Sequence, residues 1–294
     1  MNKLLGNKKA IAIFILPALI IYTVILIIPT GCTIVYSFCL YDPAKGPLFN
    51  GLGNYADLIA DDIWWTAFIN SMFFLVFSCT VQIFTGLILA FLLTSTGKGR
   101  SILEKFIFFP VILSSAVAGV IWMFLLSPGS GINEILEKFD INGPGWLVEG
   151  GALPGLPILM IAFVALWQFT GLSVMLYTRR ISYLDKEMIC AAYLDGCNRI
   201  KTFLYIEIPC LKRELGLVFF INALGALKYF DIIYNMTEGG PDNKTEVLAT
   251  YIYERGFLSY DYGQASAASA VMLILCLIIA FPIYKVFWSG RCRR

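Results

Sequence analysis

The sequence contains no histidine and few charged side chains. Of its 294 residues, only 14% are Asp, Glu, Lys or Arg, whereas 59% are hydrophobic. Histidine is the commonest general base and metal ligand, so its absence argues against a histidine-dependent hydrolase or a metalloprotease. Soluble domains carry roughly a quarter of charged residues, and a chain with far fewer cannot cover its surface with polar groups. Composition therefore predicts an integral membrane protein whose solvent is lipid.

Motifs for cofactors and disulfides are missing as well. The nearest approach to a phosphate-binding loop, Thr96-Gly97-Lys98-Gly99, lacks the leading glycine, because position 92 is leucine, and lacks Ser or Thr after the lysine. We therefore expect no ATP site, no bound cofactor and no enzyme activity on this chain. The cysteines form no CxxC pair, so free thiols without a metal are predicted. They are Cys32, Cys39, Cys79, Cys190, Cys197, Cys210, Cys276 and Cys292.

Six apolar stretches are long enough to cross a membrane, which takes about 20 residues per helix. The first follows three lysines, as a signal peptide does, but it is too long for one and shows no A-x-A cleavage pattern between Ile13 and Tyr36, so we expect a permanent helix. The predicted fold is an all-α integral membrane protein with six transmembrane helices. They run from about Ala10 to Phe38, Phe68 to Leu93, Phe106 to Leu126, Ile158 to Thr178, Leu215 to Met236 and Ala267 to Trp288.

The lysines and arginines lie mainly on one side of these spans. With both termini inside, the tails and the segments 95–105 and 179–213 hold 17 of the 22 Lys and Arg residues, if Lys285 near the end of the sixth span is counted with the C-terminal tail, and the outer segments hold four. Because cytoplasmic loops are enriched in these residues, both termini are predicted to be cytoplasmic. The predicted organisation is a tail at 1–9, a transmembrane domain at 10–290 and a tail at 291–294.

The cytoplasmic segment 179–213 is longer than a connection between two spans needs to be. Its pattern predicts two short helices separated by a break, the first from Asp185 to Leu194 and the second ending at Pro209. Asp195 is expected to cap the second helix at its N-terminus. Gly196 permits a sharp bend between the two.

This segment resembles the "EAA" coupling loop of ABC importer permeases. The family pattern is E-A-A-x-x-D-G, followed about a dozen residues later by I-x-L-P. Cys190 stands where the family has Glu, a residue that contacts a basic residue of the ATPase, and Glu187, one turn earlier, is expected to take over part of that role. The alternative is an ordinary amphipathic helix at the membrane surface. The matching residues are Ala191, Ala192, Asp195, Gly196, Ile206 and Pro209.

Other short motifs resemble sugar-importer permeases, in the family's order and over nearly the whole chain. The resemblance implies a type I ABC importer transmembrane domain in the bacterial plasma membrane. It also implies a second homologous permease, two ATPase subunits that bind ATP and Mg, an extracytoplasmic solute-binding protein and surrounding lipid, with no nucleic acid. The motifs are Leu16-Pro17-Ala18, Gly51-Leu52-Gly53-Asn54-Tyr55, Phe108-Phe109-Pro110, Thr237-Glu238-Gly239-Gly240-Pro241 and Gly263-Gln264-Ala265-Ser266-Ala267.

Polar side chains at membrane depth indicate where a solute would pass. Asn222, Ala226 and Tyr229 share one face of the fifth span, and in the resembling permeases that face lines the sugar site. The resemblance also points to Gln168 and Phe169 in the fourth span. Aromatic planes and amides suit a sugar's ring face and hydroxyls. The alternative is that the amides join helices by hydrogen bonds.

Lys228 and Asp231 stand three residues apart in the fifth span. They are expected to form an ion pair, and the alternative is a contact with substrate. The predicted function is a permease subunit that imports a di- or oligosaccharide by alternating access. The same machinery carrying glycerol phosphate or another polar solute is one alternative. A secondary transporter is another, although it would need a relay of ionisable residues or inverted repeats, neither of which the sequence displays.

Overall fold

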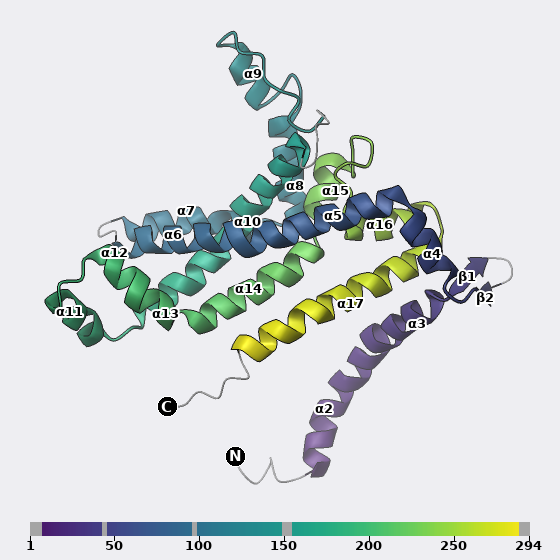
Figure 1. Cartoon of the computed structure of the whole chain (residues 1–294), viewed down its shortest axis with the longest axis horizontal. Coiled ribbons are helices and arrows are strands. Elements are labelled where there is room, and N and C mark those ends of the chain that lie inside the picture. The colour runs from purple at the N-terminus through teal and green to yellow at the C-terminus, as the bar shows by residue number, and fades with distance from the viewer. Residues whose placement is uncertain (1–7, 43–45, 96–98, 149–154, 288–294) are drawn as a thin grey trace. The chain divides into compact units, whose positions relative to one another are not determined.

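The computed structural model describes residues 8–42, 46–95, 99–148 and 155–287, which are mainly helical (Figure 1). Most of the two predicted tails, Cys292 and residues 96–98 lie outside this part of the chain. The structure divides into two compact units. The first comprises Met1–Asp61 and Ile252–Leu273, and the second comprises Asp62–Tyr251 and Ile274–Arg294.

The first unit contains an apolar span and a small hairpin. The span Ile13–Tyr36 has no buried residue in its most apolar window, so its side chains are free to contact lipid or another subunit. Two four-residue strands then pair antiparallel, with Cys39 opposite Phe49. The hairpin was not predicted, because strands this short show no readable alternation. The elements are α2 (Lys8–Tyr22), η1 (Thr23–Ile27), α3 (Ile28–Tyr36), β1 (Cys39–Asp42), β2 (Gly46–Phe49) and α4 (Gly53–Ala60).

A buried amide fastens α4 to the chain before it. Asn54 Nδ2 donates to the carbonyl oxygens of Ser37 and Cys39, both at 2.9 Å. Gly263, at the start of α17 (Tyr262–Phe287), approaches so closely that a Cβ there would lie 2.7 Å from the Cys39 oxygen. The hairpin is thereby held against the first turn of α17 within this unit.

The second unit is organised around α10, whose most apolar window is 56% buried, the largest share of any continuous span. This helix packs against α6, α7, α14 and α15. Its buried face carries branched and small residues that fill the core. The elements are α5 (Asp62–Phe77), η2 (Ser78–Gln82), α6 (Ile83–Ser95), α7 (Arg100–Ile112), α8 (Ser115–Leu126), α9 (Ile132–Glu137), α10 (Leu156–Ser182), α11 (Lys186–Leu194), α12 (Arg199–Thr202), η3 (Phe203–Glu207), α13 (Ile208–Cys210), α14 (Lys212–Leu227), α15 (Asp231–Thr237) and α16 (Leu248–Tyr253). The turn η4 (Glu254–Leu258), which leads into α17, belongs to the first unit.

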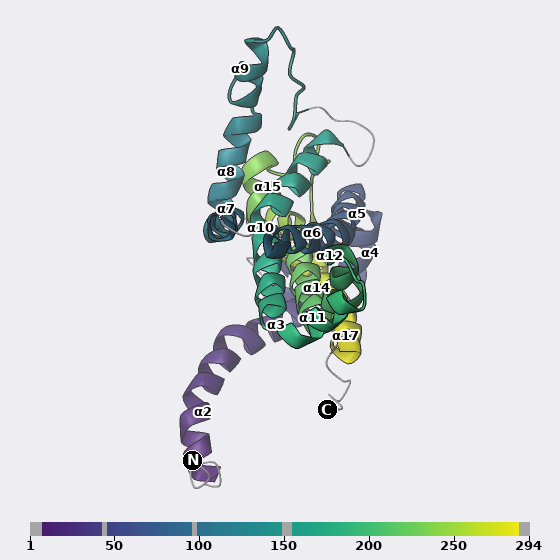
Figure 2. The same cartoon turned by 90° about the vertical axis from the view of Figure 1, so that its left-hand side faces the viewer.

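The six predicted spans correspond to four continuous helices and two bent pairs. The continuous ones are Ile13–Tyr36, Asp62–Ser95, Leu156–Ser182 and Tyr262–Ile283. The third predicted span is instead α7 and α8, which meet at 99°, and the fifth is α14 and α15, which meet at 42°. In Figure 2, α8 is seen along its length and α7 nearly end-on. Six spans are therefore obtained when each bent pair is counted as one, and the sequence did not reveal the two bends.

The break between α7 and α8 has a local cause. Leu113 is extended, and Ser114 caps α8 by accepting a hydrogen bond from the backbone N–H of Val117 at 3.3 Å. The carbonyl of Leu113 thus leaves the helical ladder inside an apolar region, where an unsatisfied group is costly. Gln168 of α10 supplies the donor, because its Nε2 lies 3.0 Å from that oxygen. A buried side chain of a neighbouring helix therefore stabilises the bend.

Gly171 allows α10 to approach α7 closely, and replacing it tests this contact. A Cβ at Gly171 would overlap the carbonyl oxygen of Ile107 and lie 2.8 Å from Val111 Cγ2. We expect Gly171→Ala to lower the free energy of unfolding in detergent by about 1–3 kcal/mol, the usual cost of overpacking. Gly225→Ala, where a Cβ meets nothing within 4 Å, is the matched control. Equal stabilities of the two variants would contradict the close approach.

Candidate functional site

The segment 179–213, named here the coupling segment, folds as two short helices with a sharp break. The Asp185 carboxylate caps α11 by accepting from the backbone N–H of Glu187 at 3.0 Å. Asp195 does not cap the second helix, contrary to the prediction, because it continues the last turn of α11. The N-cap of α12 is Asn198, whose Oδ1 accepts from Lys201 N at 2.8 Å.

Gly196 makes the break possible. Its φ of +83° lies in the left-handed region that favours glycine. The N–H of Gly196 donates to the Tyr193 carbonyl and that of Cys197 donates to the Ala192 carbonyl. This pair of bonds is the Schellman ending of a helix, in which Asp195 is the C-terminal cap. Asp195 therefore cannot be counted with the second helix.

The exposed face of α11 is the surface on which another subunit can dock. Glu187, Cys190 and Ala191 are exposed, whereas Ala192 is buried against the rest of the chain. Leu194 ends the helix with 90% of its side chain exposed. Leu194 was not singled out from the sequence, since a leucine in an apolar helix gives no sign of which way it faces.

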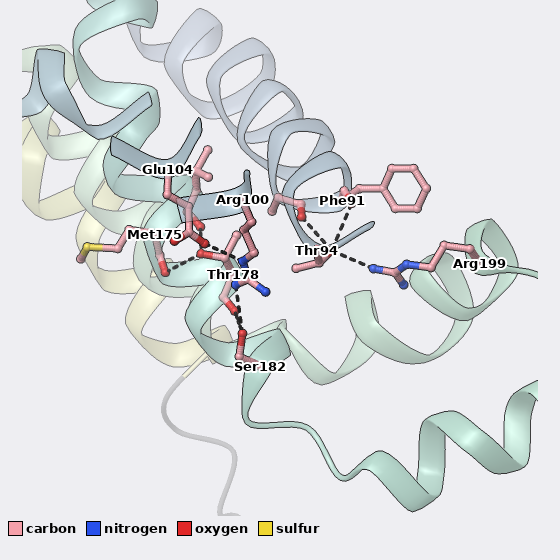
Figure 3. A network of polar contacts seen from close by, with 10 residues as sticks. Phe91, Thr94, Arg100, Glu104, Met175, Thr178, Ser182 and Arg199 are labelled. Atoms are coloured by element: carbon pink, nitrogen blue, oxygen red, sulfur yellow. Dashed lines mark hydrogen bonds and ion pairs between the residues drawn. The ribbon is translucent and has the colours of Figure 1, made fainter. Parts of the chain in front are cut away.

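Arg199 fastens the coupling segment to the end of α6 (Figure 3). Its Nη1 lies 2.6 Å from Glu207 Oε1, its Nη2 donates to Thr94 Oγ1 at 2.7 Å, and its Nε donates to Ser95 Oγ at 3.2 Å. The guanidinium also lies 5.2 Å from the centre of the Phe91 ring. Glu207 is buried, and its ion pair with Arg199 offsets the cost of burying a negative charge. These contacts are named here the Arg199 latch. Those with α6 were missed because they join residues about a hundred positions apart in the sequence.

An apolar cluster lies beneath the latch and joins the coupling segment to three spans. It is formed by α6, α10, η3 and α14, and includes Tyr177 and Leu211, both fully buried. Phe203 of η3 packs on Phe91 of α6 with ring centres 5.0 Å apart. The coupling segment is therefore packed directly onto these spans.

A mainly apolar cavity of about 390 Å³ lies in the second unit, where η2, α7, α8, α10 and α14 meet the bend between α14 and α15. It is named here the polar cavity, after the few polar side chains in its lining. Three residues predicted to line the substrate path, Phe169, Asn222 and Tyr229, line it together. Lys228 and Asp231 also line it. No ion pair between these last two is found among the described residues, so the expected pairing is not made here.

The cavity has an aromatic wall and amide donors. The rings of Phe169 and Tyr229 stack with centres 5.6 Å apart and planes 9° apart. The hydroxyls of Tyr229 and Ser78 share a hydrogen bond at 3.3 Å. Asn222 Nδ2 donates to the Ser78 carbonyl at 3.2 Å. A flat apolar surface beside hydrogen-bonding groups is the arrangement that sugar rings require.

Gln82 is a buried polar residue of this cavity that was not predicted. Only 1% of it is exposed, and its Nε2 makes no hydrogen bond within the described structure. A buried amide donor without a partner is costly, unless a ligand or water completes it. A glutamine inside the apolar second span is unusual and could have been noticed in the sequence. The sequence alone, however, does not distinguish a glutamine that binds a solute from one that joins two helices by a hydrogen bond.

Two predicted path residues lie elsewhere. Gln168 is buried and donates to the Leu113 carbonyl at the bend, which makes it a structural amide. Ala226 is buried in the apolar core beside Ile232 and Ile233. Ala226 was predicted from helical spacing and Gln168 from the family resemblance, but neighbouring elements cover both side chains.

Comparison with known proteins identifies the family. Residues 82–289 match the "binding-protein-dependent transport system inner membrane component" family. The chain belongs to this family. The match includes the coupling segment and the lining of the polar cavity, so both features occur within a membrane-embedded, multi-pass permease component.

Relatives of this permease cover its whole length. It is 30% identical to a probable ABC transporter permease protein, YurN, of Bacillus subtilis, over 97% of this chain and 98% of that one. It is 28% identical to the lactose transport system permease protein LacF of Rhizobium radiobacter, over 96% and 94% of the two chains. The fold matches a bacterial ABC transporter that imports the polysaccharide alginate, with a TM-score of 0.84 at 19% identity, over 96% of each chain.

The Arg199 latch can be tested by removing its cation alone or together with its anion. Arg199→Gln leaves the buried Glu207 carboxylate unpaired, so we expect the free energy of unfolding in detergent to fall by about 3 kcal/mol. Arg199→Gln combined with Glu207→Gln should recover most of that loss, because no buried charge remains. The control is Arg213→Gln, at an exposed position. If the double variant is less stable than the single one, the pairing described here does not stabilise the fold.

Proposed function

We propose that this permease is one transmembrane subunit of an ATP-driven importer that carries a sugar into the cytoplasm by alternating access. The observation that carries the proposal is the connection between the coupling segment and the polar cavity. Helices α6, α10 and α14 hold the coupling segment at one end, and α10 and α14, with the π-helical turn before α6, line the cavity. A push on α11 therefore reaches the cavity through three packed helices.

The motion is supplied by separate ATPase subunits, which carry ATP and Mg. The face formed by Glu187, Cys190, Ala191 and Leu194 docks on the ATPase, and the Arg199 latch passes the movement to α6. Small residues allow α11 to sit close to its partner, while exposed Leu194 offers an apolar anchor. Cys190 stands where the family has a glutamate. Glu187, exposed in the first turn of α11, takes over part of the role of that glutamate.

A sugar is the cargo that fits the cavity chemistry. The volume of about 390 Å³ falls within the range of roughly 300–1,000 Å³ for small-molecule sites. Phe169 and Tyr229 present an aromatic plane, and Gln82 offers an unused amide donor. The lactose permease relative and the alginate importer support a saccharide. Glycerol phosphate is the second candidate, favoured by Lys228 on the cavity wall, although Asp231 on the same wall opposes an anion.

The working complex contains a second homologous permease, two ATPases and an extracytoplasmic solute-binding protein. The related alginate transporter has been crystallised with its periplasmic protein. The excess of Lys and Arg in the tails and the coupling segment supports cytoplasmic termini in a bacterial plasma membrane. Residues of the partner permease complete the other half of the substrate path.

Uptake of labelled sugars into proteoliposomes holding the complete complex tests this function. ATP-dependent uptake is expected from the complex and none from this chain alone. Leu194→Asp should abolish co-purification of the ATPase, because it places a charge in an apolar contact. Phe257→Asp, at an exposed residue outside the coupling segment, is the control. Glu187→Gln should weaken the coupling of hydrolysis to uptake. ATP-independent uptake by the lone chain would instead indicate a secondary transporter.

Sugar binding to the purified complex tests the cavity. We expect Gln82→Leu to weaken equilibrium binding of the labelled sugar by up to about ten-fold, because one hydrogen bond contributes about 0.5–1.5 kcal/mol. Gln168→Leu is the matched control. It should lower thermal stability by removing the donor to the Leu113 carbonyl while leaving sugar affinity unchanged. The reverse pattern would place the substrate on Gln168 and contradict the assignment.

A further inference from the structure

A second cavity, of about 500 Å³, lies between α7 and α10 and has its own set of lining residues. It opens where α10 ends and the chain enters the coupling segment, beside Ser182 and Tyr183. Nothing in the proposed transport cycle uses it. Figure 3 shows Arg100 and Glu104 of α7 facing Thr178 and Ser182 of α10 at this end of the two helices.

The mouth of this cavity carries an excess of positive charge. Arg100, Lys105 and Arg179 line it with Glu104 as the one carboxylate. Arg100 Nε donates to Glu104 Oε1 at 2.7 Å and its Nη2 donates to Ser182 Oγ at 3.2 Å. Lys105 and Arg179 make no hydrogen bond or ion pair within the described part of the chain. Two unpaired cations beside a third repel one another, unless an anion lies between them.

The walls below the mouth are apolar. Ile107, Phe108, Val174 and Met175 line this part of the cavity. The outer surface of α7 beside it is also apolar, since Phe106 and Ile102 are 74% and 60% exposed. The site therefore joins a cationic rim to a hydrophobic floor that continues onto a lipid-facing surface. An inorganic anion satisfies the rim alone, whereas an anionic amphiphile satisfies both parts.

We propose that this cavity binds an anionic phospholipid of the cytoplasmic leaflet. The phosphate lies among Arg100, Lys105 and Arg179, and an acyl chain follows Ile107 and Met175. Basic pockets between helices on the cytoplasmic side suit such headgroups. The proposal rests on the proposed orientation, in which the coupling segment is cytoplasmic.

The position of this site connects the lipid to coupling. The headgroup bridges α7 and α10 one turn before α10 passes into the coupling segment. It neutralises the repulsion between Lys105 of α7 and Arg179 of α10, and thereby stabilises the contact between these helices. The complex should therefore take up more sugar per ATP hydrolysed when anionic lipid is present.

Native mass spectrometry of the complete complex tests the site, with nanodiscs of phosphatidylcholine alone or mixed with phosphatidylglycerol. We expect retained phosphatidylglycerol on the wild type and about 25-fold weaker retention when Lys105→Gln and Arg179→Gln are combined, since each cation contributes roughly a factor of five. The control pair is Lys212→Gln with Arg213→Gln, two exposed cations outside the cavity. The charge-conserving pair Lys105→Arg with Arg179→Lys should keep the lipid and shows that the fold tolerates change there.

Several outcomes would overturn the proposal. Equal retention by the wild type and the Lys105→Gln, Arg179→Gln pair would show that the lipid binds elsewhere. Displacement of phosphatidylglycerol by millimolar inorganic phosphate, with no preference for the lipid, would indicate a free-anion site. Cross-linking of the Met175→Cys variant to the partner permease would show that a protein surface fills the cavity. Lipid retention is measured without transport. The lipid site is therefore tested independently of the proposed sugar uptake.

Discussion

The structure depends on one constraint: a backbone carbonyl that leaves a helix inside an apolar chain must find a donor within the protein. Buried amides supply these donors. Gln168 serves the Leu113 carbonyl at the bend of the third span, Asn222 serves Ser78 in a π-helical turn, and Asn70 serves Lys244 and Glu246. Each amide lies where regular hydrogen bonding is interrupted. The breaks and the amides are therefore parts of one arrangement.

Gln82 differs from these amides, because its donor serves no backbone carbonyl. Its Nε2 is buried in the cavity wall without a partner, although its neighbours use their amides for backbone support. The bend between α14 and α15 opens the space that it faces. Interrupted helices, tolerated only where other groups satisfy them, thus produce both a stable core and a polar cavity. The proposed sugar would accept a hydrogen bond from this unpartnered amide.

In the coupling segment, at the end of the spans, a buried charged group likewise has its partner within the protein. Its buried charge, Glu207, is held by Arg199, and Arg199 in turn reaches hydroxyls at the end of α6. The apolar cluster below makes three spans respond together. The proposed lipid site adds α7 to the group through α10. Movement of α11 is therefore shared by the helices that surround the cavity, which is what alternating access needs.

The sequence by itself determined the membrane class, the number of spans and the coupling segment, because these follow from local hydrophobicity, from charge and from a short motif. Asn222 and Tyr229 were also predicted from helical spacing, and Phe169 from the family resemblance; all three line the cavity. Only the tertiary structure decided that Gln168 supports a bend, that Ala226 lies in the core and that Asp195 ends α11. It also brought Arg199 to Thr94, and Gln82 to the cavity. These outcomes depend on which neighbour covers each side chain, and spacing along one helix carries no information about the neighbour.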